Sequence, residues 1–213
     1  MVPLNEGATG RGIRGRVLPR SFFQQPPETL APALLGKILA RRQRTRLLAG
    51  RIVEVEAYLG SDDPAAHAFR GETPRNAVLF GAPGHAYVYS IYGLHCCLNV
   101  SCQPAGVAGC VLLRALEPLQ EIAAMRRNRG LEKAAALAKI ASGPGKLCAA
   151  FAITRMGENG CDLTSANSEL FLMDDGTVPE KVSRSPRIGI RKAADWPMRF
   201  FVAGNACVSR GGR

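Results

Sequence analysis

The stretch RIVEVEAY, residues 51–58, decides how this chain folds, because apolar and polar side chains alternate along it. Successive side chains of a β-strand point to opposite faces of the sheet. The apolar residues at 53, 55 and 57 are therefore expected in the core, and the opposite face carries Glu54, Glu56 and Tyr58. Taken alone, this pattern is more typical of a strand with a solvated acidic face than of a functional site.

Predicted strands and helices occur in clusters around this stretch rather than in strict alternation. The predicted strands are 37–58 with a charged turn at 41–46, then 87–92, 94–101, 109–116, 187–190 and 199–202. The predicted helices are 26–35, 118–127, 131–141 and 147–152, and a loop rich in Pro, Asp and Gly covers 61–83. Such clustering favours the α+β class, and long loops inside compact domains are usually functional or disordered.

The length of 213 residues fits one domain that can bury a core without disulfide bonds. Residues 1–17 are rich in Gly and Arg and lack hydrophobic periodicity, so we expect a disordered basic arm followed by one domain over 18–213. The sequence shows neither the apolar segment of a signal peptide nor a run of about 18 apolar residues. These features predict an intracellular protein, in the cytoplasm, nucleoid or nucleus, with no membrane partner.

Basic residues outnumber acidic ones by 28 to 17, which gives a formal net charge of +11 and a pI near 9.8. A pI this high is a reason to expect a nucleic-acid partner. A solvated basic tail explains the charge equally well. However, the excess extends beyond the arm, through residues such as Arg126, Arg127, Arg129 and Lys139.

The seven cysteines include one adjacent pair, Cys96 and Cys97, and form no C-x-x-C motif, which indicates reduced thiols. A zinc site built from His95, Cys96, Cys97 and Cys102 is conceivable. Adjacent cysteines in an apolar run are more often core residues. We therefore expect no metal and no other cofactor.

The remaining residues that could carry chemistry are weak signals when each is taken alone. A lone histidine such as His67 is more often structural than catalytic. Tyr87, Tyr89 and Tyr92 gather on one predicted strand, and tyrosine-rich strands are common in ordinary sheets. The segment GPGK at 143–146 precedes a helix and could contact a phosphate, but it lacks the spacing of a P-loop.

Seven short segments are far more specific as an ordered set than any of them is alone. They are EVEAYLG (54–60), AAH (65–67), TPRN (73–76), YVYSIYG (87–93), NVS (99–101), LLRALEP (112–118) and SGPGKL (142–147). With these spacings, the chain resembles the alkyladenine (3-methyladenine) DNA glycosylase family over about residues 18–209. The resemblance implies a single mixed α+β domain on a curved antiparallel β-sheet with surrounding helices, without a metal.

The same resemblance implies a reaction on duplex DNA that contains damaged purines. A damaged nucleotide would be flipped out of the duplex, and water would hydrolyse its N-glycosidic bond. Glu56 would deprotonate that water, while Arg114 and the backbone carbonyl of Ile188 would hold it. A carboxylate near the sugar can also stabilise the oxocarbenium character that develops as the bond breaks.

The resemblance also assigns residues to the base pocket and the DNA surface. Asn99 would disfavour the exocyclic amine of guanine, and Tyr92 would wedge into the gap left in the duplex. The aromatic walls of the pocket would be Tyr58, His67 and Tyr89. The other DNA contacts would be Thr73, Leu94, His95, Arg129 and Gly189, with Lys146 added from the GPGK loop.

No lysine lies between Glu56 and Arg114 to form the Schiff base of a lyase. The expectation is thus a monofunctional, monomeric hydrolase of the DNA-3-methyladenine glycosylase II type. A non-catalytic nucleic-acid-binding protein would explain the charge and the tyrosines, but not carboxylates among them, because carboxylates repel phosphate. A formyltransferase-like enzyme is a further alternative, although the folate-dependent motif is not found. The role of Glu54 and the preferred lesion stay open.

Overall fold

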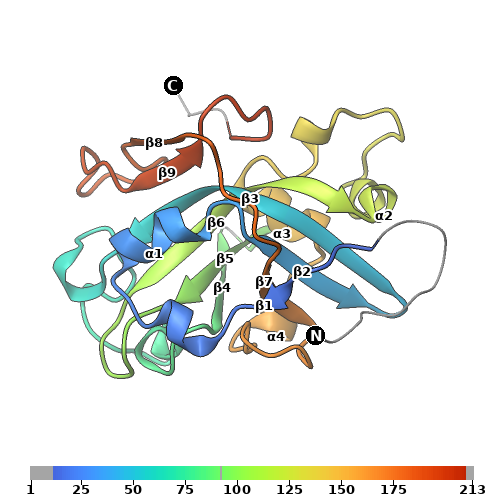
Figure 1. Ribbon diagram of the computed structural model, residues 1–213. Helices are drawn as coiled ribbons and strands as arrows, with labels where there is room; N and C mark the ends of the chain where they lie inside the picture. Colours follow the sequence, from blue (N-terminus) through green and yellow to red (C-terminus); the bar gives the residue numbers. More distant parts are fainter. Residues whose placement is uncertain (1–11, 92, 210–213) are drawn as a thin grey trace.

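Strand β3 (Arg46–Tyr58), which contains the stretch quoted above, is the centre of the sheet. Its first half lies between β2 (Ile38–Gln43) and β6 (Cys110–Gln120), and its second half lies between β6 and β9 (Arg199–Val202). The computed structural model describes residues 12–91 and 93–209 (Figure 1). Residues 54–56 thus have a hydrogen-bonded strand on both sides, which removes their backbone from solvent.

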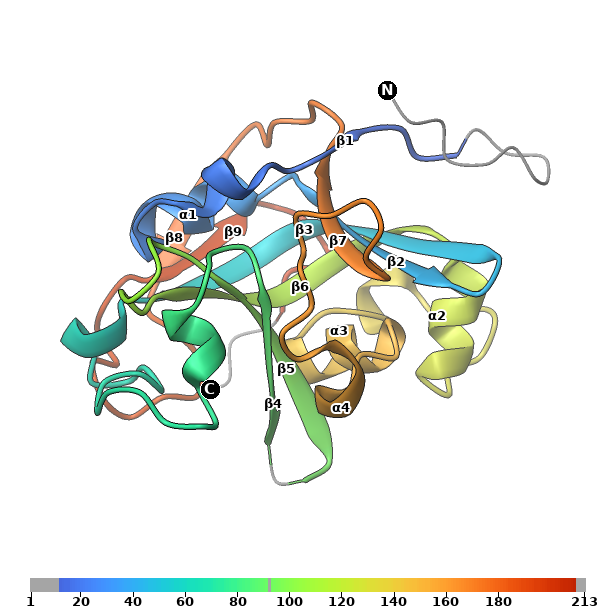
Figure 2. The ribbon, with the colours of Figure 1, turned by 90° about the horizontal axis from the view of Figure 1, so that it is seen from below.

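The other strands extend this sheet with antiparallel pairing throughout, in the order β1-β7-β2-β3-β6-β5-β4, and β8 pairs with β9. They are β1 (Arg16–Val17), β4 (Ala86–Ile91), β5 (His95–Ser101), β7 (Leu170–Asp174) and β8 (Val182–Ser185). The hairpin of β4 and β5 extends away from the sheet beside α3 and α4 (Figure 2).

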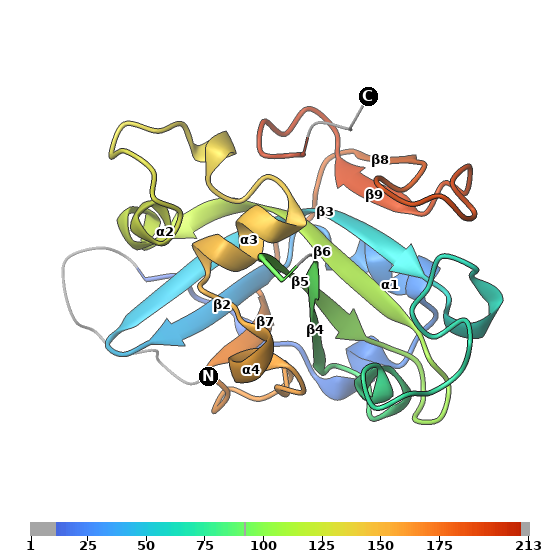
Figure 3. The same ribbon diagram turned by 180° about the vertical axis from the view of Figure 1, so that it is seen from behind.

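Helices cover the sheet on opposite sides. Figure 1 shows α1 (Pro27–Leu34) on the near side of the sheet. Figure 3 views the molecule from the opposite side and shows α3 (Pro144–Ala150) on that face. Both helices carry a proline in their first turn, where the missing N–H costs nothing. The shorter helices are α2 (Ile122–Asn128) and α4 (Arg155–Glu158). The curled antiparallel sheet with surrounding helices confirms the predicted α+β fold.

One large apolar cluster joins both helix layers to the central strands. It includes Leu30 and Leu34 of α1, Ile52 and Val55 of β3, and Leu147 of α3, all with no exposed surface. Each such burial contributes roughly 1.5–3 kcal/mol. Within the described part of the chain, no helix is both long and apolar enough to cross a bilayer.

The predicted helix at 131–141 is wrong. This segment contains only the 3₁₀ turn η4 (Leu137–Lys139), and most of its residues are exposed. Helical propensity from alanines cannot hold so short a helix without an apolar face to bury. Two of its carbonyl groups accept hydrogen bonds from side chains instead: Arg126 donates to Ala135 O and Arg129 donates to Ile140 O.

Two further element predictions are wrong, and contacts with distant residues explain both. The residue expected to open a helix, Pro118, lies in β6 opposite Gly50, next to a register shift. Proline is tolerated at such irregularities because no ladder donor is needed there. The predicted strand at 187–190 is a loop, since the side chain of Arg187 and the backbone N–H of Ile188 are bound by carboxylates.

The long loop predicted at 61–83 is present, with short 3₁₀ turns at η2 (Gly60–Asp62) and η3 (Ala77–Phe80). A fourth 3₁₀ turn, η1 (Arg20–Phe23), precedes α1. The basic arm predicted at 1–17 falls partly on residues 1–11, which lie outside the described residues. Its last residues, Arg16 and Val17, form β1 and pair with β7.

A buried ion pair fixes α4 to the sheet. Arg41 of β2 donates to Glu158 at 2.6 Å and to the carbonyl of Phe151 at 2.7 Å. We expect Arg41→Met to lower the free energy of unfolding by about 3–5 kcal/mol, because it leaves Glu158 buried without its partner. Urea denaturation followed by circular dichroism measures this loss.

The matched control is Arg46→Met, which breaks a longer and more exposed pair with Glu121 (3.8 Å). Exposed pairs contribute about 0–1 kcal/mol, so this control should stay close to the parent protein. Equal losses in both variants would contradict the structural role of Arg41.

Candidate active site

The acidic face of β3 is not solvated. Glu54 and Glu56 each have no exposed surface, although the pattern of the strand is typical of an exposed acidic face. Strands β6 and β9 flank this part of β3 and bring arginines to it, Arg114 from β6 and Arg199 from β9. A buried carboxylate persists only if it is paired and hydrogen-bonded. Each glutamate accordingly has several donors, and Arg114 is shared by both.

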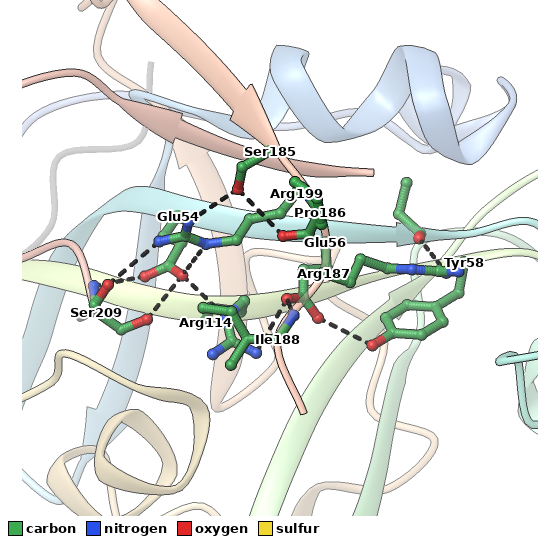
Figure 4. Close-up of polar contacts among 11 residues, drawn as sticks. Glu54, Glu56, Tyr58, Arg114, Ser185, Pro186, Arg187, Ile188, Arg199 and Ser209 are labelled. Carbon is green, nitrogen blue, oxygen red and sulfur yellow. Dashed lines mark hydrogen bonds and ion pairs between the residues drawn. The ribbon is translucent and has the colours of Figure 1, made fainter. Parts of the chain in front are cut away.

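Three donors converge on Glu56 (Figure 4). The hydroxyl of Tyr58 donates to Oε2 at 2.9 Å, and the backbone N–H of Ile188 donates to Oε1 at 2.8 Å. Arg114 Nη1 lies 3.2 Å from the same Oε1. Glu56 is therefore in direct contact with Tyr58 from its own strand and with Arg114 and Ile188, which are far away in the sequence.

The surroundings of Glu56 favour a basic carboxylate. Burial raises the pKa of Glu56, and the charge of Arg114 with the Ile188 and Tyr58 hydrogen bonds only partly offsets this effect. Burial and the neighbouring Glu56 also raise the pKa of Tyr58, so its phenol stays protonated as a donor. The arrangement can hold Glu56 as an ionised group with a high affinity for a proton.

Glu54 has the denser set of partners. Its Oε1 accepts from Arg114 Nε at 2.9 Å, from Arg199 Nε at 2.7 Å and from Ser209 Oγ at 2.7 Å, and its Oε2 accepts from the Ser209 N–H at 2.6 Å. Burial raises the pKa of Glu54, but the hydrogen bonds from Arg199 and Ser209 and the charge of Arg114 outweigh it, so the pKa is lowered. Glu54 is therefore firmly ionised.

Another buried ion pair supports the loop that carries Ile188. Arg187 and Asp63 have fully buried side chains and bind each other, with Arg187 Nη2 at 2.9 Å from Asp63 Oδ1. Arg187 also donates to the carbonyl of Ala57 and lies over the ring of Tyr58, 4.6 Å from its centroid. The sequence predictions missed both residues, because nothing in the local pattern around either one distinguishes it from a surface charge.

Aromatic side chains form a cluster beside this network. The rings of His67 and Tyr89 meet edge-on with centroids 4.5 Å apart, and His67 Nδ1 lies 2.8 Å from the hydroxyl of Tyr87. Burial and the charge of Arg75 lower the pKa of His67, which favours the neutral ring. Tyr58 belongs to the same apolar cluster as Tyr87 and Tyr89. The structure thus gathers the predicted aromatic walls and adds the buried Tyr87.

Asn99 lies at the base of this cluster and is buried. Its Nδ2 donates to the carbonyl of Tyr87 at 3.2 Å, and the thiol of Cys110 lies 3.7 Å from its Oδ1. Burial raises the pKa of Cys110 to about 12, so the thiol keeps its proton and can donate. The amide of Asn99 is therefore oriented by two neighbours.

Part of the predicted DNA surface lies at the end of the β4–β5 hairpin. Leu94 is 82% exposed and His95 is exposed. The start of α3 approaches this hairpin, since a Cβ added at Gly145 would lie 3.3 Å from the Cβ of His95. Lys146 is exposed on the same turn of α3, and Tyr92 lies outside the described residues.

The other predicted DNA contacts are spread over three loops. The backbone N–H of Thr73 donates to Asn76 Oδ1 at 2.6 Å, which fixes the loop after His67. Arg129 is half-buried, and its Nε donates to the carbonyl of Ile140 at 3.0 Å, so this part of the guanidinium is bound within the protein. Gly189 has φ of +79°, a left-handed conformation that favours glycine.

The cysteines lie mostly in the interior. Cys97 and Cys102 are buried, and all seven thiols are free. Within residues 12–91 and 93–209, no group of three or more His, Cys, Asp or Glu side chains is arranged to hold a metal ion.

Comparison with known proteins identifies the family of this chain. The model of the family described as methylpurine-DNA glycosylase matches residues 21–206. A protein of Koribacter versatilis named "Putative 3-methyladenine DNA glycosylase" is 56% identical over 192 residues, which cover 90% of this chain and 92% of that protein. Proteins with the same name from Burkholderia lata and Methanocella arvoryzae are 47% and 46% identical, over 92% and 91% of this chain and 92% and 96% of theirs. The chain therefore belongs to the methylpurine-DNA glycosylase family, whose members are hydrolases of N-glycosyl bonds that act on DNA.

Proposed function

We propose that this protein is a monofunctional glycosylase of the DNA-3-methyladenine glycosylase II type. It flips an alkylated or deaminated purine out of duplex DNA and hydrolyses the N-glycosidic bond, which leaves an abasic site. The observation that carries the proposal is the convergence of Arg114, Tyr58 and the Ile188 N–H on one buried carboxylate, Glu56. Glu56 accepts the proton of the attacking water and stabilises the positive charge that develops on the sugar.

Arg114 and Ile188 are suited to hold that water beside Glu56. Arg114 Nη1 lies 3.2 Å from Glu56 Oε1, so a water bound to the carboxylate is also within reach of the guanidinium. The backbone of Ile188 is fixed by its hydrogen bond to Glu56, and its carbonyl group provides the second acceptor for the water. The water is thereby oriented before the bond breaks.

The aromatic cluster is suited to receive the flipped base. Tyr58, His67 and Tyr89 offer electron-rich rings, which attract an alkylated and therefore cationic purine by up to about 2 kcal/mol when desolvated. Extrusion itself costs a few kcal/mol. Tyr92, two residues before the exposed Leu94, offsets part of this cost by filling the gap in the duplex. Asn99 disfavours the amine of normal guanine.

The alternative of a non-catalytic DNA-binding protein does not explain the buried charges. Two carboxylates enclosed with two arginines are expensive to bury, and binding phosphate requires neither of them. A catalyst requires both a base and a group that orients water. We propose further that the protein acts as a monomer on duplex DNA containing damaged purines.

Replacing Glu56 tests the assignment of the base. We expect Glu56→Gln to reduce release of hypoxanthine from a duplex oligonucleotide on the order of 100-fold or more under single-turnover conditions, because the amide cannot accept the proton. The exposed Glu169→Gln is the matched control and should keep the parent rate. Near-full activity of Glu56→Gln, with an unchanged melting temperature, would exclude this role.

The pH dependence of the rate follows from the burial of Glu56. Only the ionised carboxylate accepts a proton, so the rate falls as the pH decreases through the pKa of Glu56. Because burial raises this pKa, the acidic limb of the single-turnover profile should lie above the ordinary pKa of a glutamate. A rate that stays constant down to that ordinary pKa would contradict the proposed environment of the base.

A monofunctional mechanism predicts no covalent intermediate with DNA. A lyase needs an amine nucleophile, whereas the groups bound to Glu56 in the described structure are a guanidinium, a phenol and a peptide N–H. Borohydride added during the reaction should trap no protein–DNA complex, and strand breaks should require alkali. A trapped complex that persists in Glu56→Gln would refute the hydrolytic mechanism.

A further inference from the structure

Arg114 is shared unequally between two carboxylates. Its Nε lies 2.9 Å from Glu54 Oε1, whereas its Nη1 lies 3.2 Å from Glu56 Oε1. The Nε side of the guanidinium is therefore bound to Glu54, and only Nη1, at the longer distance, faces Glu56 (Figure 4). Arg114 therefore neutralises Glu56 less completely than a bidentate pair with Glu56 would.

Glu54 is itself held in place by donors other than Arg114. Arg199 Nε lies 2.7 Å from Oε1, and Ser209 binds both oxygens through its hydroxyl and its N–H. Arg199 is fixed in turn, because its Nη1 donates to Ser185 Oγ and its Nη2 donates to the carbonyl of Ser209. The pairing of β3 with β6 shifts register on both sides of Glu54, and such irregularities re-aim a side chain.

We propose that Glu54 is the positioning residue of the site: it fixes Arg114 and takes up much of its charge, so that Glu56 stays basic enough to accept the proton of water. The inference rests on the proposed function of Glu56. Glu54 touches neither DNA nor water in this role and acts only through Arg114. It also gives a purpose to Arg199, which balances the charge of Glu54.

The charges around Glu56 predict the direction in which its pKa shifts when a neighbour is replaced, and this direction tests the role of Glu54. The titratable and charged groups that face Glu56 come from four places in the fold: Arg114 from β6, Glu54 and Tyr58 from β3, Arg187 from the loop after β8, and Cys97 from β5. The phenol and the thiol are neutral, since burial raises the pKa of both, and Arg187 is paired with Asp63. Glu54, Glu56, Arg114 and Arg199 then sum to zero net charge.

Two single substitutions disturb this balance in opposite directions. Glu54→Gln leaves one excess positive charge and frees Arg114 to pair with Glu56, which lowers the pKa of Glu56. The acidic limb of the rate profile should move to lower pH. The plateau rate should fall roughly 10- to 100-fold, a loss typical of removing a residue that orients a functional side chain, here Arg114. Arg199→Gln leaves one excess negative charge, and the acidic limb should move to higher pH.

The experiment measures single-turnover release of hypoxanthine from duplex DNA across the acidic pH range for the parent and both variants. The double variant Glu54→Gln/Arg199→Gln restores zero net charge, and its acidic limb should lie between those of the two single variants. Circular dichroism at each pH confirms that the variants are folded. If Glu54→Gln does not fold, the upward shift in Arg199→Gln and the intermediate limb of the double variant still test the idea.

Opposite shifts of the acidic limb support the proposal. A loss of rate with an unmoved limb in the folded variants, or shifts in the same direction, would overturn it and leave Glu54 as part of the scaffold. Failure of the proposed function gives a different result, because Glu56→Gln would then retain excision. An inactive Glu56→Gln together with unmoved limbs contradicts the role of Glu54 alone.

Discussion

Two glutamates and two arginines share one enclosed space beside the central strand, and the need to keep these four charges balanced shapes the rest of the molecule. Neither Glu54 nor Glu56 is exposed to water. Isolated charges in such a place cost far more free energy than the fold can spare, so several elements supply partners. Strands β6 and β9 supply the arginines, and the loops at 187–188 and 209 supply backbone N–H groups.

The sequence predicts the frame of this arrangement well. The alternation at 51–58 identifies β3, because side chains of a strand alternate between the two faces of a sheet, and a near-continuous apolar run identifies the buried strand β6. The hairpin strands β4 and β5 are predicted close to their observed bounds. The alanines at 131–141 suggest a helix that does not form, since Arg126 and Arg129 bind the carbonyls of that segment. Propensity is a local quantity, and here contacts across the segment override it.

The residues of the site also fall into those that the sequence indicates and those that only the structure reveals. Glu56, Tyr58 and Arg114 lie in segments whose order and spacing point to a known family, so the sequence singles them out. The sequence does not single out Arg199, Ser209, Arg187 or Asp63, because each is a common residue whose importance arises only when distant segments meet. The buried state of Glu54 is equally hidden, since a strand with alternating glutamates is indistinguishable from a solvated one until its neighbours are known.

The partners of Glu54 also constrain the order in which the molecule can be assembled. Arg114, Arg199 and Ser209 follow Glu54 by 60, 145 and 155 residues. During synthesis, therefore, strand β3 is complete long before the groups that neutralise it have been made. Contacts of such wide separation are slow to form, and a nascent chain that ends before residue 199 lacks two of the three residues that bind Glu54. The charge network around Glu54 can accordingly be completed only after Ser209 has been synthesised, so the chain must grow by 155 residues past Glu54 before this carboxylate has all of its partners.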